Sequence, residues 1–187
     1  MQNNMLEKCP DKNGFTLPEL LVAVALSGVI LTAIYTLLVG SHKSQVAQDL
    51  QMKMHQNARL AADFAVREMR AIQTISCMEN SATPCSMTGD RITFTSTLDS
   101  DTRVFSWSSA DRILRFSKSP GAPVRQPLAE NIISFTLTPY DSNNNIAMQL
   151  SKVKRIDISV TSRTSQADPN INTYRTYTIK TSVVKRN

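Results

Sequence analysis

The stretch that decides the fold lies at residues 15–39 and reads FTLPELLVAVALSGVILTAIYTLLV. From Leu20 to Val39 it holds twenty residues without a charge. A helix of that length spans about 30 Å, the thickness of a bilayer core. The apolar region of a cleaved secretory signal is shorter, about 7–15 residues, and its small-residue cleavage site follows it. Here Ala23-Val24-Ala25 lies inside the run, so the sequence predicts a retained membrane helix.

Pro18 restricts where this helix can begin. Inside a helix, proline removes a hydrogen bond and costs about 3 kcal/mol. If the chain began at Phe15, Pro18 would be its fourth residue and would lie in the first turn, where backbone N–H groups have no helical partner. The sequence therefore favours a new N-terminus at Phe15.

Glu19 is the only charged residue in 15–39. A carboxylate in hydrocarbon is costly, less so near an end of the helix, and it usually marks a functional pairing. A free amine on Phe15 would be its natural partner, within one chain or between neighbouring chains. The alternative is that Glu19 lies at the membrane interface and complements the helix dipole, for about 0.3–1 kcal/mol.

The N-terminal region resembles a type IV prepilin, through KNG at 12–14, FTLPELL at 15–21 and the apolar run that follows. The resemblance implies that a prepilin peptidase removes residues 1–14 as a leader peptide, cutting between Gly14 and Phe15, and that Phe15 becomes N-methylated. It also implies that Glu19, the fifth mature residue, guides entry of the subunit into a filament.

The orientation of the helix rests on the same resemblance. Lys8 and Lys12 precede the helix, and Lys43, Lys53 and Arg59 follow it, so the count of flanking positive charges is ambiguous. The resemblance implies a single-pass inner-membrane protein with a cytoplasmic N-terminus and a periplasmic C-terminal domain. The mature protein would then enter a pilus at the cell surface.

The helical pattern continues beyond the apolar run. From Val46 to Ile75, apolar residues recur mostly at three- and four-residue spacing, as in an amphipathic helix. We therefore expect one helix from Phe15 to about Ser76, with a transmembrane or assembly half at 15–39 and an amphipathic half at 40–76.

Residues 77–187 read mostly as strands. Their apolar positions alternate, most clearly at 92–98, 105–107, 133–137, 156–160 and 177–183. A sheet of this size needs a cover on one face. The predicted fold is thus α+β, a long N-terminal helix packed on an antiparallel β-sheet in a periplasmic β-rich domain. The pilin family has this arrangement.

Further segments of the chain resemble PilW-type minor pilins, and the J-type pseudopilins of type II secretion are close relatives. These segments are Glu68-Met69-Arg70, Asp90–Phe94, Leu128–Ile132 and 183–187. The leading hypothesis is a minor pilin that helps prime pilus assembly. Its partners would be the other minor pilins, the major pilin and the inner-membrane assembly platform. The alternative is a pseudopilin of a type II secretion system.

The chain has three cysteines. If Cys9 is lost with the leader, Cys77 and Cys85 remain as a pair around a polar loop that contains Pro84. An unstrained bridge here would contribute roughly 2.5 kcal/mol in the chain-entropy model, and it would imply an oxidising compartment. The alternative is two unrelated free thiols. Zinc fits less well, because no other Cys or His lies near in the sequence.

The net charge of +6 arises in residues 150–187, where eight Lys/Arg face Asp157 and Asp168. A basic segment can attract phosphates or acidic partners, which raises a third hypothesis, DNA binding during DNA uptake. Only Tyr174 and Tyr177 lie near these cations, so base stacking would have little support. A solvated strand face is the favoured interpretation.

Catalytic, metal and cofactor sites are not predicted. The five glycines lie far apart, so no glycine-rich phosphate loop can form. His42 and His55 do not share a close helical face, and the serines at 106–109 lack a nucleophile elbow. Trp107 is expected in the core. We expect a structural protein rather than an enzyme.

Overall fold

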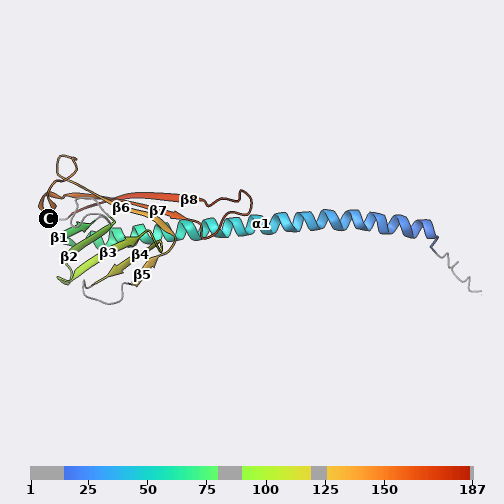
Figure 1. The fold of residues 1–187 in the computed structure, drawn as a ribbon, viewed down its shortest axis with the longest axis horizontal. Coiled ribbons are helices and arrows are strands. Elements are labelled where there is room, and N and C mark those ends of the chain that lie inside the picture. Colours follow the sequence, from blue (N-terminus) through green and yellow to red (C-terminus); the bar gives the residue numbers. More distant parts are fainter. Residues whose placement is uncertain (1–14, 80–89, 119–125, 186–187) are drawn as a thin grey trace, which may run out of the picture. The chain divides into compact units, whose positions relative to one another are not determined.

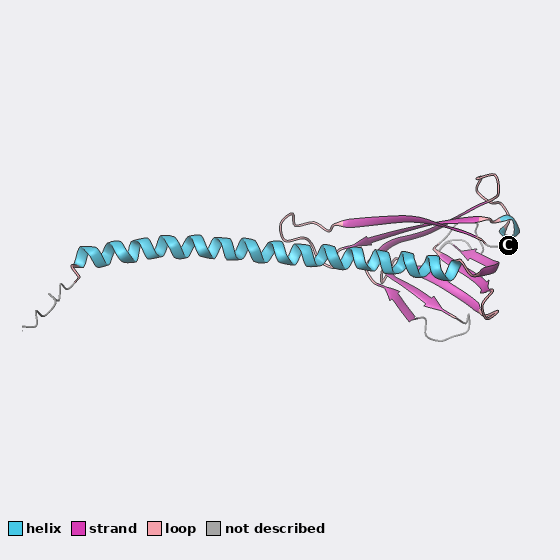
Figure 2. Cartoon of the chain, turned by 180° about the vertical axis from the view of Figure 1, so that it is seen from behind, coloured by secondary structure: helices cyan, strands magenta, loops and turns pink. Residues whose placement is uncertain are grey.

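A computed structural model of the chain describes residues 15–79, 90–118 and 126–185. Among these residues the helix α1 (Leu17–Met69) comes first and is followed by eight strands. The chain divides into two compact units, residues 1–43 and 44–187, and α1 contributes to both. Figures 1 and 2 show the strands gathered along the C-terminal part of α1, which belongs to the second unit.

The strands form two antiparallel sheets. The first has the order β1-β2-β3-β4-β5, and the second has the order β6-β7-β8. A 3-10 helix, η1 (Leu150–Lys152), precedes β7. The strand bounds are β1 (Ile72–Glu79), β2 (Arg91–Ser96), β3 (Thr102–Ser108), β4 (Ile113–Ser117), β5 (Gln126–Ala129), β6 (Ile132–Tyr140), β7 (Arg155–Arg163) and β8 (Thr176–Val184). The predicted α+β class, a long helix on antiparallel strands, is confirmed, although the strands form two sheets rather than one.

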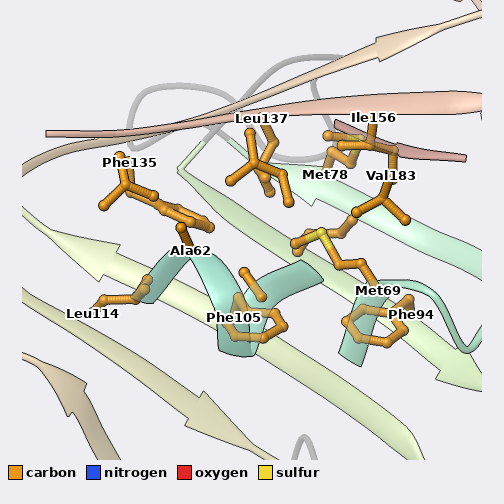
Figure 3. Packing of buried hydrophobic residues seen from close by; sticks show 14 of the residues in the cluster. Ala62, Met69, Met78, Phe94, Phe105, Leu114, Phe135, Leu137, Ile156 and Val183 are labelled. Atoms are coloured by element: carbon orange, nitrogen blue, oxygen red, sulfur yellow. The ribbon is translucent and has the colours of Figure 1, made fainter. Parts of the chain in front are cut away.

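The core of the second unit lies where α1 meets both sheets. The helix buries one stripe, made of Ala47, Leu50, Met54, Ala58, Ala61, Ala62, Ala65 and Met69. Most of these are alanines, whose small side chains let the sheets approach the helix closely. Figure 3 shows two members of this stripe, Ala62 and Met69, among large side chains from both sheets, such as Phe105 of β3 and Phe135 of β6.

The predicted end of the helix is wrong. The sequence predicts a helix to about Ser76 and a β-rich part at 77–187, but α1 ends at Met69 and residues 72–79 form β1. The error has a physical cause. A register shift between Ile72 and Thr74 lets Ile72 and Ile75 both point inward, 2% and 9% exposed. A bulged strand thus reproduces the three-residue spacing of a helix.

Other differences concern short or irregular elements. β5 and η1 were not predicted, and β6 continues through Pro139 to Tyr140, beyond the alternation at 133–137. Trp107 packs against the core as expected, and its indole Nε1–H donates to the Ile132 carbonyl at 2.8 Å. This bond joins β3 of one sheet to β6 of the other.

Candidate processing and assembly site at the start of the helix

The first turn of α1 is held by Thr16 and Glu19. The backbone N–H of Thr16 donates to Oε2 of Glu19 at 2.9 Å, and the Thr16 hydroxyl donates to the same oxygen at 2.8 Å. The Thr16 carbonyl accepts from the N–H of Leu20 at 3.2 Å. In Thr16-Leu17-Pro18-Glu19 the acid returns to the N-cap residue, which is one half of a capping box. The Thr-x-x-Glu spacing in the sequence is the signal for this role of Glu19.

Pro18 is the second residue of the helix. The first four N–H groups of a helix have no internal partner, so the missing N–H of proline costs little there. The helix therefore begins at Leu17 rather than at Phe15. Pro18 is tolerated in its first turn whether or not the chain is cut before Phe15.

The predicted site residues differ in what the structure shows of them. Phe15 lies just before the helix and is 89% exposed, and Glu19 is exposed one turn further on. Gly14 lies outside the described residues, so cleavage and N-methylation stay predictions. In the intact sequence the nitrogen of Phe15 is a peptide nitrogen and carries no positive charge.

No described residue donates to Oε1 of Glu19, so this oxygen remains as an acceptor for an amine.

The helix that follows this site is apolar on every side. All residues from Phe15 to Ser44 are exposed. Among the described elements, α1 is long and apolar enough to cross a membrane, and its most apolar window has a mean hydropathy of 2.4 and no buried residue. A helix that is hydrophobic all round normally lies in a membrane or among other apolar helices.

Three hydroxyl groups within this apolar helix have partners in the helix itself. Ser27, Thr32 and Thr36 donate to the carbonyl groups of Ala23, Gly28 and Ala33 at 2.7–2.8 Å. Polar groups in hydrocarbon must be satisfied internally, and this bonding meets that condition for the three side chains.

Cys77 lies in β1, is 9% exposed and is disulfide-bonded. Its predicted partner, Cys85, lies outside the described residues. The Cys77–Cys85 pairing therefore stays a prediction.

Several cations of residues 150–187 have partners within the chain. Nε of Arg155 lies 2.9 Å from Asp157, and Nε of Arg175 lies 2.6 Å from Asp168. The guanidinium of Arg163 lies over the Tyr174 ring, 4.3 Å from its centroid. These arginines hold their own fold together, and fewer charges are left for an outside anion than the composition indicated.

The histidines do not form a metal site in the described part of the chain. The structure holds no group of three or more His, Cys, Asp or Glu side chains there that could bind a metal ion. His55 instead packs edge-on against the Tyr177 ring, with 4.0 Å between the ring centroids. This contact joins α1 to β8.

One comparison with known proteins bears on this site. A family model described as the prokaryotic N-terminal methylation motif matches residues 9–35. The matched segment contains Gly14, Phe15 and Glu19 and most of the apolar run. No curated protein matches the chain. The N-terminal region is thus prepilin-like, which implies processing by a prepilin peptidase, anchoring in a membrane and membership of a pilus or secretion machinery.

Proposed function

We propose that the chain is a minor type IV pilin of the PilW type, a structural subunit that helps prime pilus assembly. One observation carries the proposal: the methylation motif at 9–35 contains most of an apolar segment, residues 15–39, whose single acid is Glu19 and which nothing in the described chain covers. Such a helix requires lipid before assembly and other helices afterwards. The resemblance at Glu68-Met69-Arg70, Asp90–Phe94 and Leu128–Ile132 supports the PilW subgroup.

Processing creates the partner that Glu19 lacks. Hydrolysis of the bond between Gly14 and Phe15 leaves a carboxylate on the leader and an amine on Phe15, and methylation of that amine preserves its positive charge. Oε2 of Glu19 is held by Thr16, at 2.8–2.9 Å, while Oε1 can accept from the amine of a neighbouring subunit. Pairing the two charges lowers the cost of burying either among apolar helices.

The domain plan follows from this route. Residues 1–14 are the leader, residues 15–39 cross the inner membrane with the N-terminus in the cytoplasm, and the rest folds in the periplasm before the subunit joins the surface pilus. A disulfide at Cys77 requires an oxidising compartment, which supports the periplasmic placement. The partners are the prepilin peptidase, the other minor pilins, the major pilin and the inner-membrane assembly platform.

Mass spectrometry of the native protein tests the processing steps. The mature chain should begin at a singly methylated Phe15, and the peptides that contain Cys77 and Cys85 should be found joined by a disulfide that reduction breaks.

Replacing Gly14 by a larger residue should leave the uncut precursor in the membrane. A native protein that still begins at Met1, in cells with normal pili and normal secretion, would contradict the proposal.

Glu19→Ala tests the assembly step. Cleavage should continue, but incorporation into pili should fall more than about tenfold, because the amine of a neighbour would be buried without a counter-charge. Thr16→Val is the matched control, since it removes the hydroxyl bond to Glu19 and keeps the carboxylate; it should assemble nearly normally. Equal incorporation of Glu19→Ala and the unaltered protein would rule out the pairing role.

A deletion strain tests the pseudopilin alternative. Normal pili with lost export of secreted proteins in this strain would favour that alternative.

A further inference from the structure

The two sheets have four edge strands, β1, β5, β6 and β8, among the described residues. An edge strand presents unpaired N–H and C=O groups, and proteins protect such edges with prolines, bulges or short strands. β1 pairs with β2 through two register shifts. β5 contains Pro127 and one shift, and β6 contains Pro139 and one shift. Three of these four edges are therefore interrupted.

β8 differs from the other three edges. It pairs with β7 over nine successive residue pairs without a register shift, from Thr176 to Val184, and it contains no proline. No other described strand pairs with it. Figure 1 shows β8 as a long continuous strand along the rim of the domain. The result is an uninterrupted edge of nine residues with only Lys180 as a charged side chain.

Two hydrogen bonds show which backbone groups face the open side. Thr164 N–H donates to the Arg175 carbonyl and Lys185 N–H donates to the Lys154 carbonyl, at 2.9 and 2.8 Å. Both pairs continue the β7–β8 register. Antiparallel pairs alternate between bonded and non-bonded. Arg175 and Lys185 both belong to bonded pairs, so every second residue between them, that is, each odd-numbered residue of β8, also bonds to β7. The N–H and C=O groups of the even-numbered residues, including Thr178, Lys180 and Ser182, therefore point away from the sheet.

Charge decides what can pair with this edge. A second copy that docked its own β8 antiparallel in the centred register would place Lys180 opposite Lys180, and like charges directly opposite each other destabilise a strand pair. A segment with a carboxylate at that position would gain from the same geometry. The edge thus fits a different polypeptide with an acidic side chain at its centre.

The outer face beside the edge suits such a segment. A groove of about 670 Å³ lies over β6, β7 and β8, lined by hydroxyl groups and by Arg155, Asp157 and Lys180. Ser182 lines the groove and also belongs to the open edge. Side chains of an added strand that point to this face would meet hydrogen-bonding groups as well as apolar surface such as Ile158.

We propose that β8 is a docking edge that binds an extended segment of another polypeptide, with an Asp or Glu opposite Lys180, as a fourth strand of the β6-β7-β8 sheet. Main-chain hydrogen bonds would supply affinity and the acid would supply specificity. This goes beyond the proposed function, since it requires neither cleavage at Gly14 nor the apolar helix.

Photo-crosslinking of the full chain in its native cells tests the proposal. p-Benzoylphenylalanine replaces Thr178, which is exposed and on the open edge, and mass spectrometry maps the adduct. The expected product joins β8 to one segment of a different chain that contains Asp or Glu. The matched control places the same residue at Ser109, which is exposed between β3 and β4 of the other sheet, and it should not give that adduct.

Two variants, each combined with the photo-residue at Thr178, test the mode of binding. Ser182→Pro removes an N–H that points to the open edge and should lower the adduct yield about tenfold, by loss of a ladder bond and a clash of the ring with the added strand. Lys180→Glu should lower the yield about two- to fivefold, and it covers the case in which the proline variant fails to fold. An adduct to a second copy, no adduct at all, or a yield that neither substitution changes would each overturn the proposal.

Discussion

The two halves of α1 use the same backbone for opposite purposes. Residues 20–39 are apolar on every side and all exposed, whereas residues 44–69 bury a single stripe of mainly alanines against two sheets. The second half finds its partners within its own domain. The first half finds none among the described residues, so its hydrophobic surface is available to lipid or to other subunits. The half of α1 that packs in the domain is therefore the one with a narrow apolar stripe, and not the half with more apolar residues.

The C-terminal end of the second half is also held by charge. Arg103 of β3 is 4% exposed and its guanidinium pairs with Glu68 of α1 and with Asp99 of the β2–β3 turn. Phe64, one turn before Glu68, meets the rings of Phe105 and Phe116 edge-on. The first half of α1 has no comparable contacts in the described chain.

Glu68→Ala should give the largest effect on the folded domain. It leaves the buried guanidinium of Arg103 with Asp99 alone, and the loss should be about 3 kcal/mol, the lower end of the range for a buried charge left wholly unpaired. Chemical denaturation of the full-length protein in detergent, followed by Trp107 fluorescence, measures the loss.

Asp63→Ala is the matched control for this prediction. Asp63 lies on the same helix but is exposed, so its replacement should change the free energy of unfolding by less than about 0.5 kcal/mol. Equal effects of the two substitutions would show that Arg103 is not held by Glu68.

Ala62→Leu should give the next largest effect and compares the two halves directly. Ala62 is 3% exposed and lies in the core with Phe105 and Phe135 (Figure 3), where added methylenes cost about 1–3 kcal/mol. Ala33→Leu makes the same change in the first half, where the side chain is exposed, and should leave domain unfolding unchanged. A shift of the unfolding midpoint by Ala33→Leu would mean that the first half also packs on the domain.

How much the sequence could predict follows from the same contrast. The apolar run and the single acid are local signals, so the first half of the helix and the position of Glu19 were identified from residue order alone. The end of α1 was not. The buried residues Ile72 and Ile75 of the bulged β1 have the three-residue spacing that a further turn of helix would also have. Only the pairing of this segment with β2 makes it a strand.

Long-range pairing also explains what was missed in the sheets. The ion pair of Arg103 with Glu68 joins residues far apart in the sequence, and the division into two sheets depends on which strands become neighbours. The short strand β5 contains a proline, Pro127, and lacks clear alternation. The open edge of β8 is likewise a property of strand order, although the alternation at 177–183 had predicted the strand itself.

Acid should give the smallest effect, and it should act on the second unit. The N–H of Asn170 holds the pKa of Asp168 below its ordinary value, with burial opposing this and Arg175 adding to it. Hydrogen bonds from Arg103 and Arg115 similarly lower the pKa values of Asp99 and Asp111. A carboxyl whose pKa is lower in the folded state stabilises the fold above the ordinary aspartate value of about 3.9, and this contribution is lost as the pH falls through the lowered pKa.

The midpoint of thermal unfolding should therefore stay level from about pH 7 to 5 and fall below about pH 4. Strand loss followed by circular dichroism measures it. Asp168→Asn is the informative variant, because it removes a carboxylate that is 1% exposed and keeps a side chain of the same size. It should be less stable than the unaltered protein at neutral pH and should lose less on acidification, so that the two curves converge toward pH 2. Parallel curves would show that Asp168 does not stabilise the fold through its charge, and the turn at residues 168–172 would then depend on its backbone bonds alone.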